Sequence, residues 1–142
     1  MSAKKIKAEI PFKMQVSATP GGANVLGCFL CGSCTACCPV SEIDGGYNPR
    51  KIMRMILLDK KDETLSSPEI WKCNQCHACV AHCPQDVRFA DVLRSLRELA
   101  VDGGFAPLSL VGEIDEIDRE TRKLRLEKIS AHLAGNSRGG CS

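Results

Sequence analysis

The clearest helical pattern in the chain follows residue 88. Apolar residues recur there at intervals of three and four positions, the spacing of one face of an α-helix. They are Phe89, Val92, Leu93, Leu96, Leu99 and Ala100. Gly103-Gly104 then supplies a stop of the kind at which helices commonly end. We predict an amphipathic helix from about Phe89 to this glycine pair.

Helical signals also fill the stretch from residue 48 to residue 71. Asn48-Pro49 is a suitable start, since proline is favoured at the first helical position. One face is apolar and the basic residues lie elsewhere: Ile52, Met53, Ile56 and Leu57 against Arg50, Lys51, Arg54 and Lys61. Ser66-Ser67-Pro68-Glu69 gives a second start, leading toward Trp71. We therefore predict helices throughout this segment.

A longer helix is predicted from Glu113 to Leu133. A narrow, mainly apolar stripe follows it at helical spacing, made by Ile114, Ile117, Thr121, Leu124, Lys128 and Ile129. Acidic residues gather in its first turns and basic residues later, which suits the helix dipole. Most of these charges are interpreted as a solvated face. Gly135 to Ser142 is predicted to be a flexible tail.

The first 22 residues carry weaker signals. A short apolar alternation runs from Ile6 to Val16 and fits either an edge strand or an extended arm. Thr19-Pro20-Gly21-Gly22 is a turn cluster that closes the segment. We interpret residues 1–22 as an N-terminal docking arm.

Composition limits both the core and the compartment. The 142 residues include ten cysteines but only six aromatic residues, so the core is expected to be thin. Met1 to Lys13 has no continuous hydrophobic stretch of the secretory type, which favours a cytoplasmic protein with reduced thiols. The apolar stretch around Ile52 to Leu58 is far shorter than the roughly 20 residues of a membrane span. A net charge of +2 is too balanced for a nucleic-acid-binding surface.

The candidate chemistry lies in two runs of cysteine. The first is Cys28-x2-Cys31-x2-Cys34-x3-Cys38-Pro39, and the second is Cys73-x2-Cys76-x2-Cys79-x3-Cys83-Pro84. Each fits the run of ferredoxins with two 4Fe-4S clusters, in which the fourth cysteine ligates the other cluster. Three closely spaced thiolates can reach three iron corners of one cubane, but the chain leaves that cubane before the fourth cysteine. Each fourth thiolate is therefore aimed at the neighbouring cluster.

We accordingly assign the ligands in two crossed sets. Cluster one is assigned Cys28, Cys31, Cys34 and Cys83, and cluster two is assigned Cys73, Cys76, Cys79 and Cys38. Crossing ties the two halves together and makes metal binding part of folding. A pair of four-cysteine zinc sites is the alternative, although zinc motifs usually present two cysteine pairs separated by a long spacer.

Four side chains near the runs or in the tail have no assigned role. Cys37 is interpreted as an inert buried thiol, with a spare ligand or a tuning group as the alternatives. Cys141, in the predicted tail, is interpreted as incidental. His77 and His82 flank the second run, but neither the ligand count nor the spacing requires a histidine ligand.

The sequence resembles the C subunit of heterodisulfide reductase over roughly residues 22–107. The resemblance rests on CFLCGSCTACCPV, on the spacer beginning at Asn48-Pro49-Arg50, and on WKCNQCHACVAHCPQDV. It implies an all-α fold of the alpha-helical ferredoxin type with two 4Fe-4S clusters, held by the eight cysteines assigned above. It further implies a non-catalytic electron-transfer subunit of an oxidoreductase complex. In that family the partners are a flavin-containing iron-sulfur subunit of the A type and a catalytic, disulfide-reducing subunit of the B type.

The resemblance has limits that define the alternatives. Cys37-Cys38 is followed by Pro39, so the CCG-type motif of the B-type partner is not present. A sulfur-oxidising heterodisulfide-reductase-like complex stays open, as does an iron-sulfur subunit of the succinate dehydrogenase or fumarate reductase type. A non-redox interaction module stapled by metal is a third interpretation. No nucleotide-binding glycine loop or nucleophile-base constellation indicates a self-contained enzyme.

We therefore predict that the chain has three parts and one docking surface. The parts are the docking arm (1–22), the dicluster helical ferredoxin domain (23–107), and a C-terminal helix with its tail (108–142). A basic face is expected to dock onto larger subunits, together with the arm and the last helix. Its residues are Arg50, Lys51, Arg54, Lys60 and Lys61.

Overall fold

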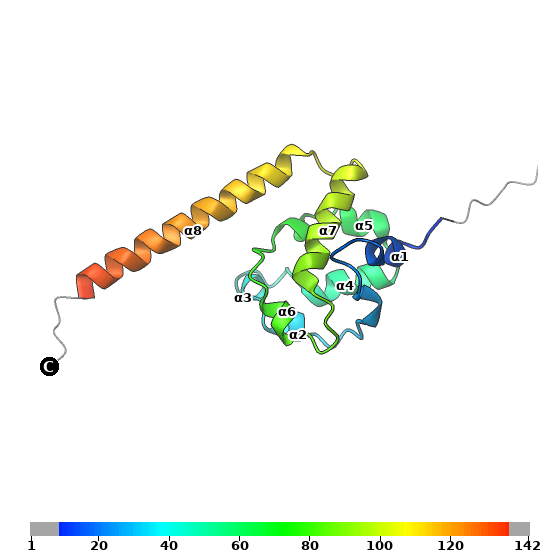
Figure 1. The fold of residues 1–142 in the computed structure, drawn as a ribbon, viewed down its shortest axis with the longest axis horizontal. Coiled ribbons are helices and arrows are strands. Elements are labelled where there is room, and N and C mark those ends of the chain that lie inside the picture. The colour runs from blue at the N-terminus through cyan, green and yellow to red at the C-terminus, as the bar shows by residue number, and fades with distance from the viewer. Residues whose placement is uncertain (1–8, 137–142) are drawn as a thin grey trace, which may run out of the picture. The chain divides into compact units, whose positions relative to one another are not determined.

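Helices are the only regular elements in the part of the chain that the computed structural model describes, residues 9–136 (Figure 1). The chain divides into two compact units, Met1–Ala106 and Pro107–Ser142. The first unit contains α1 (Phe12–Ser17), η1 (Val25–Gly27), α2 (Ser33–Ala36), α3 (Pro39–Ile43), α4 (Pro49–Leu57), α5 (Lys61–Leu65), η2 (Pro68–Trp71), α6 (Ala78–His82) and α7 (Phe89–Asp102), where η denotes a short 3-10 helix. The second contains α8 (Ser109–Asn136). The predicted all-α fold is confirmed.

The core of the first unit is built on α7. Its buried face carries Phe89, Ala90, Val92, Leu93, Ser95, Leu96 and Ala100. Helices α1, α5, α6 and η2 all contact α7, which lies in the middle of this unit (Figure 1). The helix ends at Gly103, and Gly104 follows in the left-handed region at φ 75°, which glycine adopts without strain. The predicted amphipathic helix and its glycine stop are therefore confirmed.

The predicted start at Asn48-Pro49 is confirmed by α4. Asn48 Oδ1 accepts hydrogen bonds from the Lys51 backbone N–H and from the Thr35 hydroxyl, both at 3.0 Å. The Thr35 oxygen in turn accepts from the backbone N–H of Arg50 at 3.0 Å. This network caps α4 and fastens it to α2, the short helix of the first cysteine run. Pro68 likewise opens η2, which is a single 3-10 turn.

The N-terminal segment differs from its prediction. Residues 12–17 form a helix, so the edge-strand alternative is wrong for this part, and residues 1–8 lie outside the described residues. Phe12 and Val16 are 3% and 0% exposed and join the core of the first unit. The Lys13 ammonium pairs with the Asp59 carboxylate at 2.9 Å. Burial of these two apolar side chains stabilises the contact of α1 with the rest of the first unit, so residues 12–17 are not a free arm.

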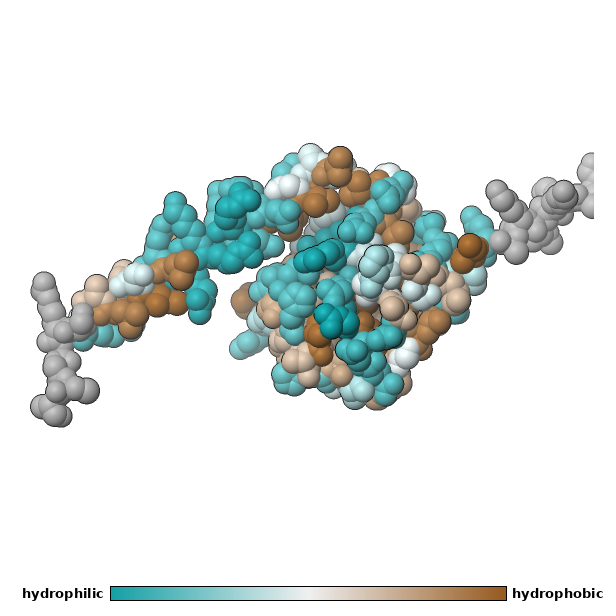
Figure 2. Space-filling view, in the orientation of Figure 1, coloured by the Kyte–Doolittle hydropathy of each residue, from teal (hydrophilic) through white to brown (hydrophobic). Residues whose placement is uncertain are grey.

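The second unit is the 28-residue helix α8. It includes the predicted span, begins four residues earlier at Ser109 and continues past Gly135 to Asn136. Cys141 and the rest of the predicted tail lie outside the described residues. Figure 2 shows apolar side chains in the second half of α8 on the visible face. The large exposed apolar residues of this half are Leu124, Leu126, Ile129 and Leu133. Over the described residues, no helix has the length and apolar character needed to cross a membrane.

Candidate metal centre

The two cysteine runs repeat one backbone conformation. Two residues after the first cysteine of each run, Leu30 (φ 58°) and Gln75 (φ 55°) are left-handed. Two residues further, Gly32 (φ 85°) and His77 (φ 61°) are left-handed as well. Left-handed residues at alternate positions bend the chain sharply around each run. The sequence repeat therefore corresponds to a repeated local structure.

Backbone N–H groups donate to three of the predicted ligand sulfurs. Leu30 N–H donates to Cys28 Sγ, Gln75 N–H to Cys73 Sγ, and Val87 N–H to Cys83 Sγ, each at 3.4 Å. Donors aimed at a sulfur stabilise its thiolate form, which is the form that binds metal. At Cys28 and Cys73 these donors counter part of the effect of burial, which raises the pKa of both thiols.

Short helices carry the third cysteine of each run. Cys34 lies in α2 and Cys79 in α6, and these two helices contact each other. The contact brings the two runs together although they are 45 positions apart in the sequence. Each run ends in a Cys-Pro pair, which is Cys38-Pro39 in the first run and Cys83-Pro84 in the second.

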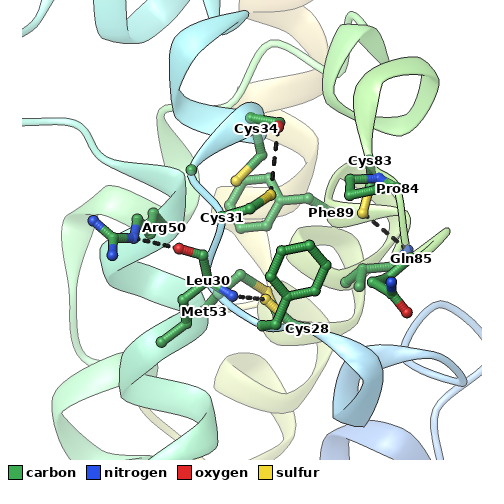
Figure 3. Close-up of a pocket in the computed structure, with 14 residues that line it drawn as sticks. Cys28, Leu30, Cys31, Cys34, Arg50, Met53, Cys83, Pro84, Gln85 and Phe89 are labelled. Atoms are coloured by element: carbon green, nitrogen blue, oxygen red, sulfur yellow. Dashed lines mark hydrogen bonds between the residues drawn. The ribbon is translucent and has the colours of Figure 1, made fainter.

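One pocket is lined by all four cysteines predicted for cluster one. Figure 3 shows Cys28, Cys31 and Cys34 from the first run on one side and Cys83 from the second run on the other. The remaining lining residues are mostly apolar and include Phe29, Leu30, Met53, Pro84, Val87 and Phe89. The structure therefore brings this crossed set together.

A second pocket is lined by all four cysteines predicted for cluster two. They are Cys38 from the first run and Cys73, Cys76 and Cys79 from the second. Apolar residues again dominate the rest of the lining, among them Val40, Pro49 and Ala90. Cys34 and Phe89 line both pockets, so the two sites are immediate neighbours.

The donor chemistry fits iron-sulfur clusters. All nine cysteines of the described part of the chain are free thiols, so disulfides do not compete for the eight predicted ligands. Soft thiolate sulfurs are the ligands that such clusters select. The mainly apolar lining limits access of water, and the N–H donors counter the negative charge of a thiolate-bound cluster. The eight cysteines would hold the clusters.

The surroundings of the thiols shift their pKa values, and these shifts oppose or favour the binding of metal. Burial raises the pKa of Cys34 to about 11 and the pKa of Cys79 to about 12. In the exposed Cys31, a hydrogen bond with Ser33 lowers the thiol pKa. The buried thiols are therefore protonated at neutral pH in the absence of metal, and metal binding must release their protons.

Three residues near the second pocket were not predicted from the sequence. Arg97 of α7 donates from Nε to Ile70 O at 2.8 Å and from Nη2 to the Cys73 carbonyl at 2.8 Å. Gln75 Nε2 donates to Cys73 Sγ at 3.5 Å and to Ala90 O at 3.1 Å. Tyr47 is 1% exposed and lines the pocket. Only Arg97 carries a sequence signal, since it lies four residues after buried Leu93, at the edge of the apolar face of α7.

The side chains without an assigned role also have definite places. Cys37 is half-buried beside the second pocket, outside both sets of lining cysteines, with Sγ 3.7 Å from Cys34 O. Burial, then the neighbouring Cys38 and Cys76, raise the pKa of Cys37. His77 lines the second pocket, and the His82 ring nitrogen Nδ1 lies 2.9 Å from Ala78 O.

The residues of the predicted basic face lie in two separate places. A groove beside the first pocket is lined by Leu30, Asn48, Arg50, Lys51 and Arg54. Lys60 instead pairs with Glu63 at 3.3 Å, and Lys61 Nζ donates to Gln15 Oε1 at 3.1 Å. Neither Lys60 nor Lys61 lines the groove. Only the α4 part of the predicted face therefore borders a cysteine pocket.

Comparison with known proteins supports the assignment of iron-sulfur clusters and identifies the family. A family model described as a 4Fe-4S dicluster domain matches residues 24–87, which include both cysteine runs. The C subunit of a Methanosarcina mazei ferredoxin:CoB-CoM heterodisulfide reductase is 36% identical over 115 residues that cover 75% of this chain and 70% of that protein. This chain belongs to the family of heterodisulfide reductase C subunits. The resemblance found in the sequence is confirmed.

Other members of this family match a shorter region. The C2 subunit of the Methanococcus maripaludis H2/formate:CoB-CoM heterodisulfide,ferredoxin reductase is 39% identical over 82 residues, or 58% of this chain and 44% of that protein. The C subunit of the Methanothermobacter thermautotrophicus H2:CoB-CoM heterodisulfide,ferredoxin reductase is 39% identical over 85 residues, or 60% and 45%. The chain thus spans less than half of the length of these two relatives.

Proposed function

We propose that this chain holds two 4Fe-4S clusters and relays electrons inside a heterodisulfide reductase-type complex. It would exchange electrons with a flavin-containing iron-sulfur subunit of the A type and with a catalytic, disulfide-reducing subunit of the B type. The observation that carries the proposal is the pair of neighbouring pockets, each of which is lined by the four cysteines predicted for one cluster, drawn from both runs. A 4Fe-4S cluster, when bound, supplies reversible electron uptake.

Each pocket has an exposed side at which electrons could enter or leave such a relay. One predicted ligand of each pocket is exposed, Cys31 at the first and Cys76 at the second. Phe29, which lines the first pocket, is 59% exposed. Between the pockets lie Cys34 and Phe89, which border both. An exposed edge at each pocket lets each cluster face a different partner, while the shared wall keeps the two sites close.

Metal analysis of anaerobically purified protein tests the cluster content. We expect close to eight irons and eight acid-labile sulfides per chain, because each cysteine run specifies one cubane. Broad visible absorption should accompany them and should bleach on reduction. Stoichiometric zinc without such absorption would contradict the proposal, and clusters that cannot be reduced would favour a purely structural metal site.

Partner capture tests the relay itself. The chain, tagged and purified anaerobically from its native host, should bring down a flavin-containing iron-sulfur protein and a disulfide-reducing protein. Recovery with sulfur-oxidising or succinate-oxidising proteins would assign the same clusters to a different complex.

A further inference from the structure

A buried hydroxyl beside the second pocket makes no hydrogen bond of normal length and angle among the described residues, although the Cys73 thiol is its neighbour. It belongs to Tyr47, whose residue is 1% exposed. Buried polar groups are nearly always hydrogen-bonded, so a buried hydroxyl without a partner points to a group missing from its surroundings. Tyr47 is the only tyrosine in the chain.

The position of Tyr47 is fixed from its backbone. The Tyr47 N–H donates to Asp44 O at 3.0 Å, and the Ser41 hydroxyl donates to the Tyr47 carbonyl at 2.9 Å. The ring is thereby held in the wall of the second pocket, which Cys38 and Cys73 also line.

We propose that Tyr47 is a tuning residue for the second cluster, whose hydroxyl donates a hydrogen bond to the Cys73 thiolate. The inference rests on the proposed binding of that cluster. A phenol is a proton donor at neutral pH, and a cluster-bound thiolate is a strong acceptor that a free thiol is not. A bound cluster would hold Cys73 as the thiolate, and the buried hydroxyl would then face a strong acceptor.

Such a bond would distinguish the two clusters electronically. Cys73 Sγ already accepts from the Gln75 backbone N–H at 3.4 Å and from Gln75 Nε2 at 3.5 Å. Cys28, the corresponding cysteine of the first run, accepts from the Leu30 N–H, and its pocket contains no tyrosine. Hydrogen bonds to ligand sulfurs favour the more negative, reduced cluster and raise its potential. Tyr47 therefore raises the potential of the second cluster relative to the first.

Redox titration of the Tyr47→Phe holoprotein tests the proposal. The change removes the hydroxyl and keeps the ring, so both clusters should remain. The midpoint potential of the second cluster should fall, so that at a fixed solution potential its ratio of reduced to oxidised forms drops roughly fivefold. The first cluster should not shift. Electron paramagnetic resonance follows both clusters, and a Cys38→Ser variant identifies the signal of the second.

The single tyrosine allows a second test without mutation. Biosynthetic incorporation of 3-fluorotyrosine modifies Tyr47 alone and makes its phenol a stronger donor. The potential of the second cluster should then rise, opposite to the Tyr47→Phe shift. A fluorine hyperfine coupling should also appear on the second cluster. The Tyr47→Phe protein grown with 3-fluorotyrosine is the matched control, because it contains no tyrosine to label. Its potentials should equal those of unlabelled Tyr47→Phe, and it should show no fluorine coupling.

The outcomes are distinct. Unchanged potentials in Tyr47→Phe would overturn the proposal, as would equal shifts in both clusters, which would indicate a general packing change. If Tyr47→Phe lost the second cluster, the fluorotyrosine protein would decide, and no upward shift there would overturn the proposal. Absence of clusters from the unmodified protein would instead overturn the proposed function itself.

Discussion

At the scale of single residues, adjacent cysteines have different surroundings. Cys38 lines the second pocket, whereas its neighbour Cys37 lies outside both sets of lining cysteines. A one-residue difference in register thus decides which thiol faces the site. The crossed ligand assignment makes this difference testable.

Cys38→Ser should perturb the second cluster and leave the first intact. A harder oxygen ligand would replace a soft thiolate, which should weaken the cubane or convert it. Cys83→Ser should do the reverse and perturb the first cluster, although Cys83 belongs to the second run. Iron content and electron paramagnetic resonance of the anaerobic proteins measure both effects.

Cys37→Ser is the control for these variants. It should leave both clusters present, since Cys38 supplies the fourth ligand at the required spacing. If Cys37→Ser lost a cluster while Cys38→Ser kept both, the register assigned to the first run would be wrong by one residue.

At the scale of elements, the turn after α1 contains two glycines that each lie against another part of the backbone. A Cβ built on Gly22 would lie 1.9 Å from the carbonyl oxygen of Val16, and one built on Gly21 would lie 2.4 Å from the Asp91 carbonyl oxygen. Both obstacles are backbone atoms, which cannot rotate away. The turn cluster that closes the predicted arm therefore positions α1 against α7.

Gly22→Ala should lower the free energy of unfolding of the first unit by roughly 1–3 kcal/mol, because the backbone must shift to admit the methyl group. Thermal unfolding of the anaerobic holoprotein measures the change. The matched variant is Gly45→Ala, since a Cβ at Gly45 would meet no atom within 4 Å. Equal stability of the two variants would indicate that residues 11–22 do not pack as described here.

At the scale of the whole molecule, the basic groove beside the first pocket is a candidate docking surface. Lys51 and Arg54 line it, whereas Lys60 is paired with Glu63 away from it. Rim charges act mainly through association rate, which depends on ionic strength. The position of the groove beside the proposed site of the first cluster is what favours it for docking.

Lys51→Glu and Arg54→Glu together should slow association with the acidic surface of a partner protein and reduce its salt dependence. The iron content should not change, because neither residue lines a cysteine pocket. Lys60→Glu should have a smaller effect on association. Association kinetics at several salt concentrations measure this, and an unaltered rate would place the docking surface elsewhere.

Removal of the clusters should unfold much of the first unit. Its core contains few aromatic residues. The predicted crossed ligands would link the two runs through metal, in addition to the contact between α2 and α6. Hydrogen exchange should become fast across residues 28–105 after anaerobic chelation. Helical circular dichroism that stays unchanged without clusters would contradict this expectation.

The sequence by itself determined the features that depend on nearby residues. Apolar periodicity predicted α7 and α8, and the Asn48-Pro49 and Pro68 starts predicted α4 and η2. The repeated cysteine spacing marked the two segments that share one backbone conformation. These features follow from backbone hydrogen bonding and side-chain spacing over a few positions, so a linear pattern contains them.

Tertiary structure decided what depends on distant parts of the chain. A short segment with ambiguous alternation became the helix α1 because Phe12 and Val16 could be buried against the rest of the first unit. Packing also separated Lys60 and Lys61 from the groove, and it placed Tyr47 and Arg97 near Cys73. Those neighbours come from contacts between residues that are far apart in sequence, and no local periodicity encodes such contacts.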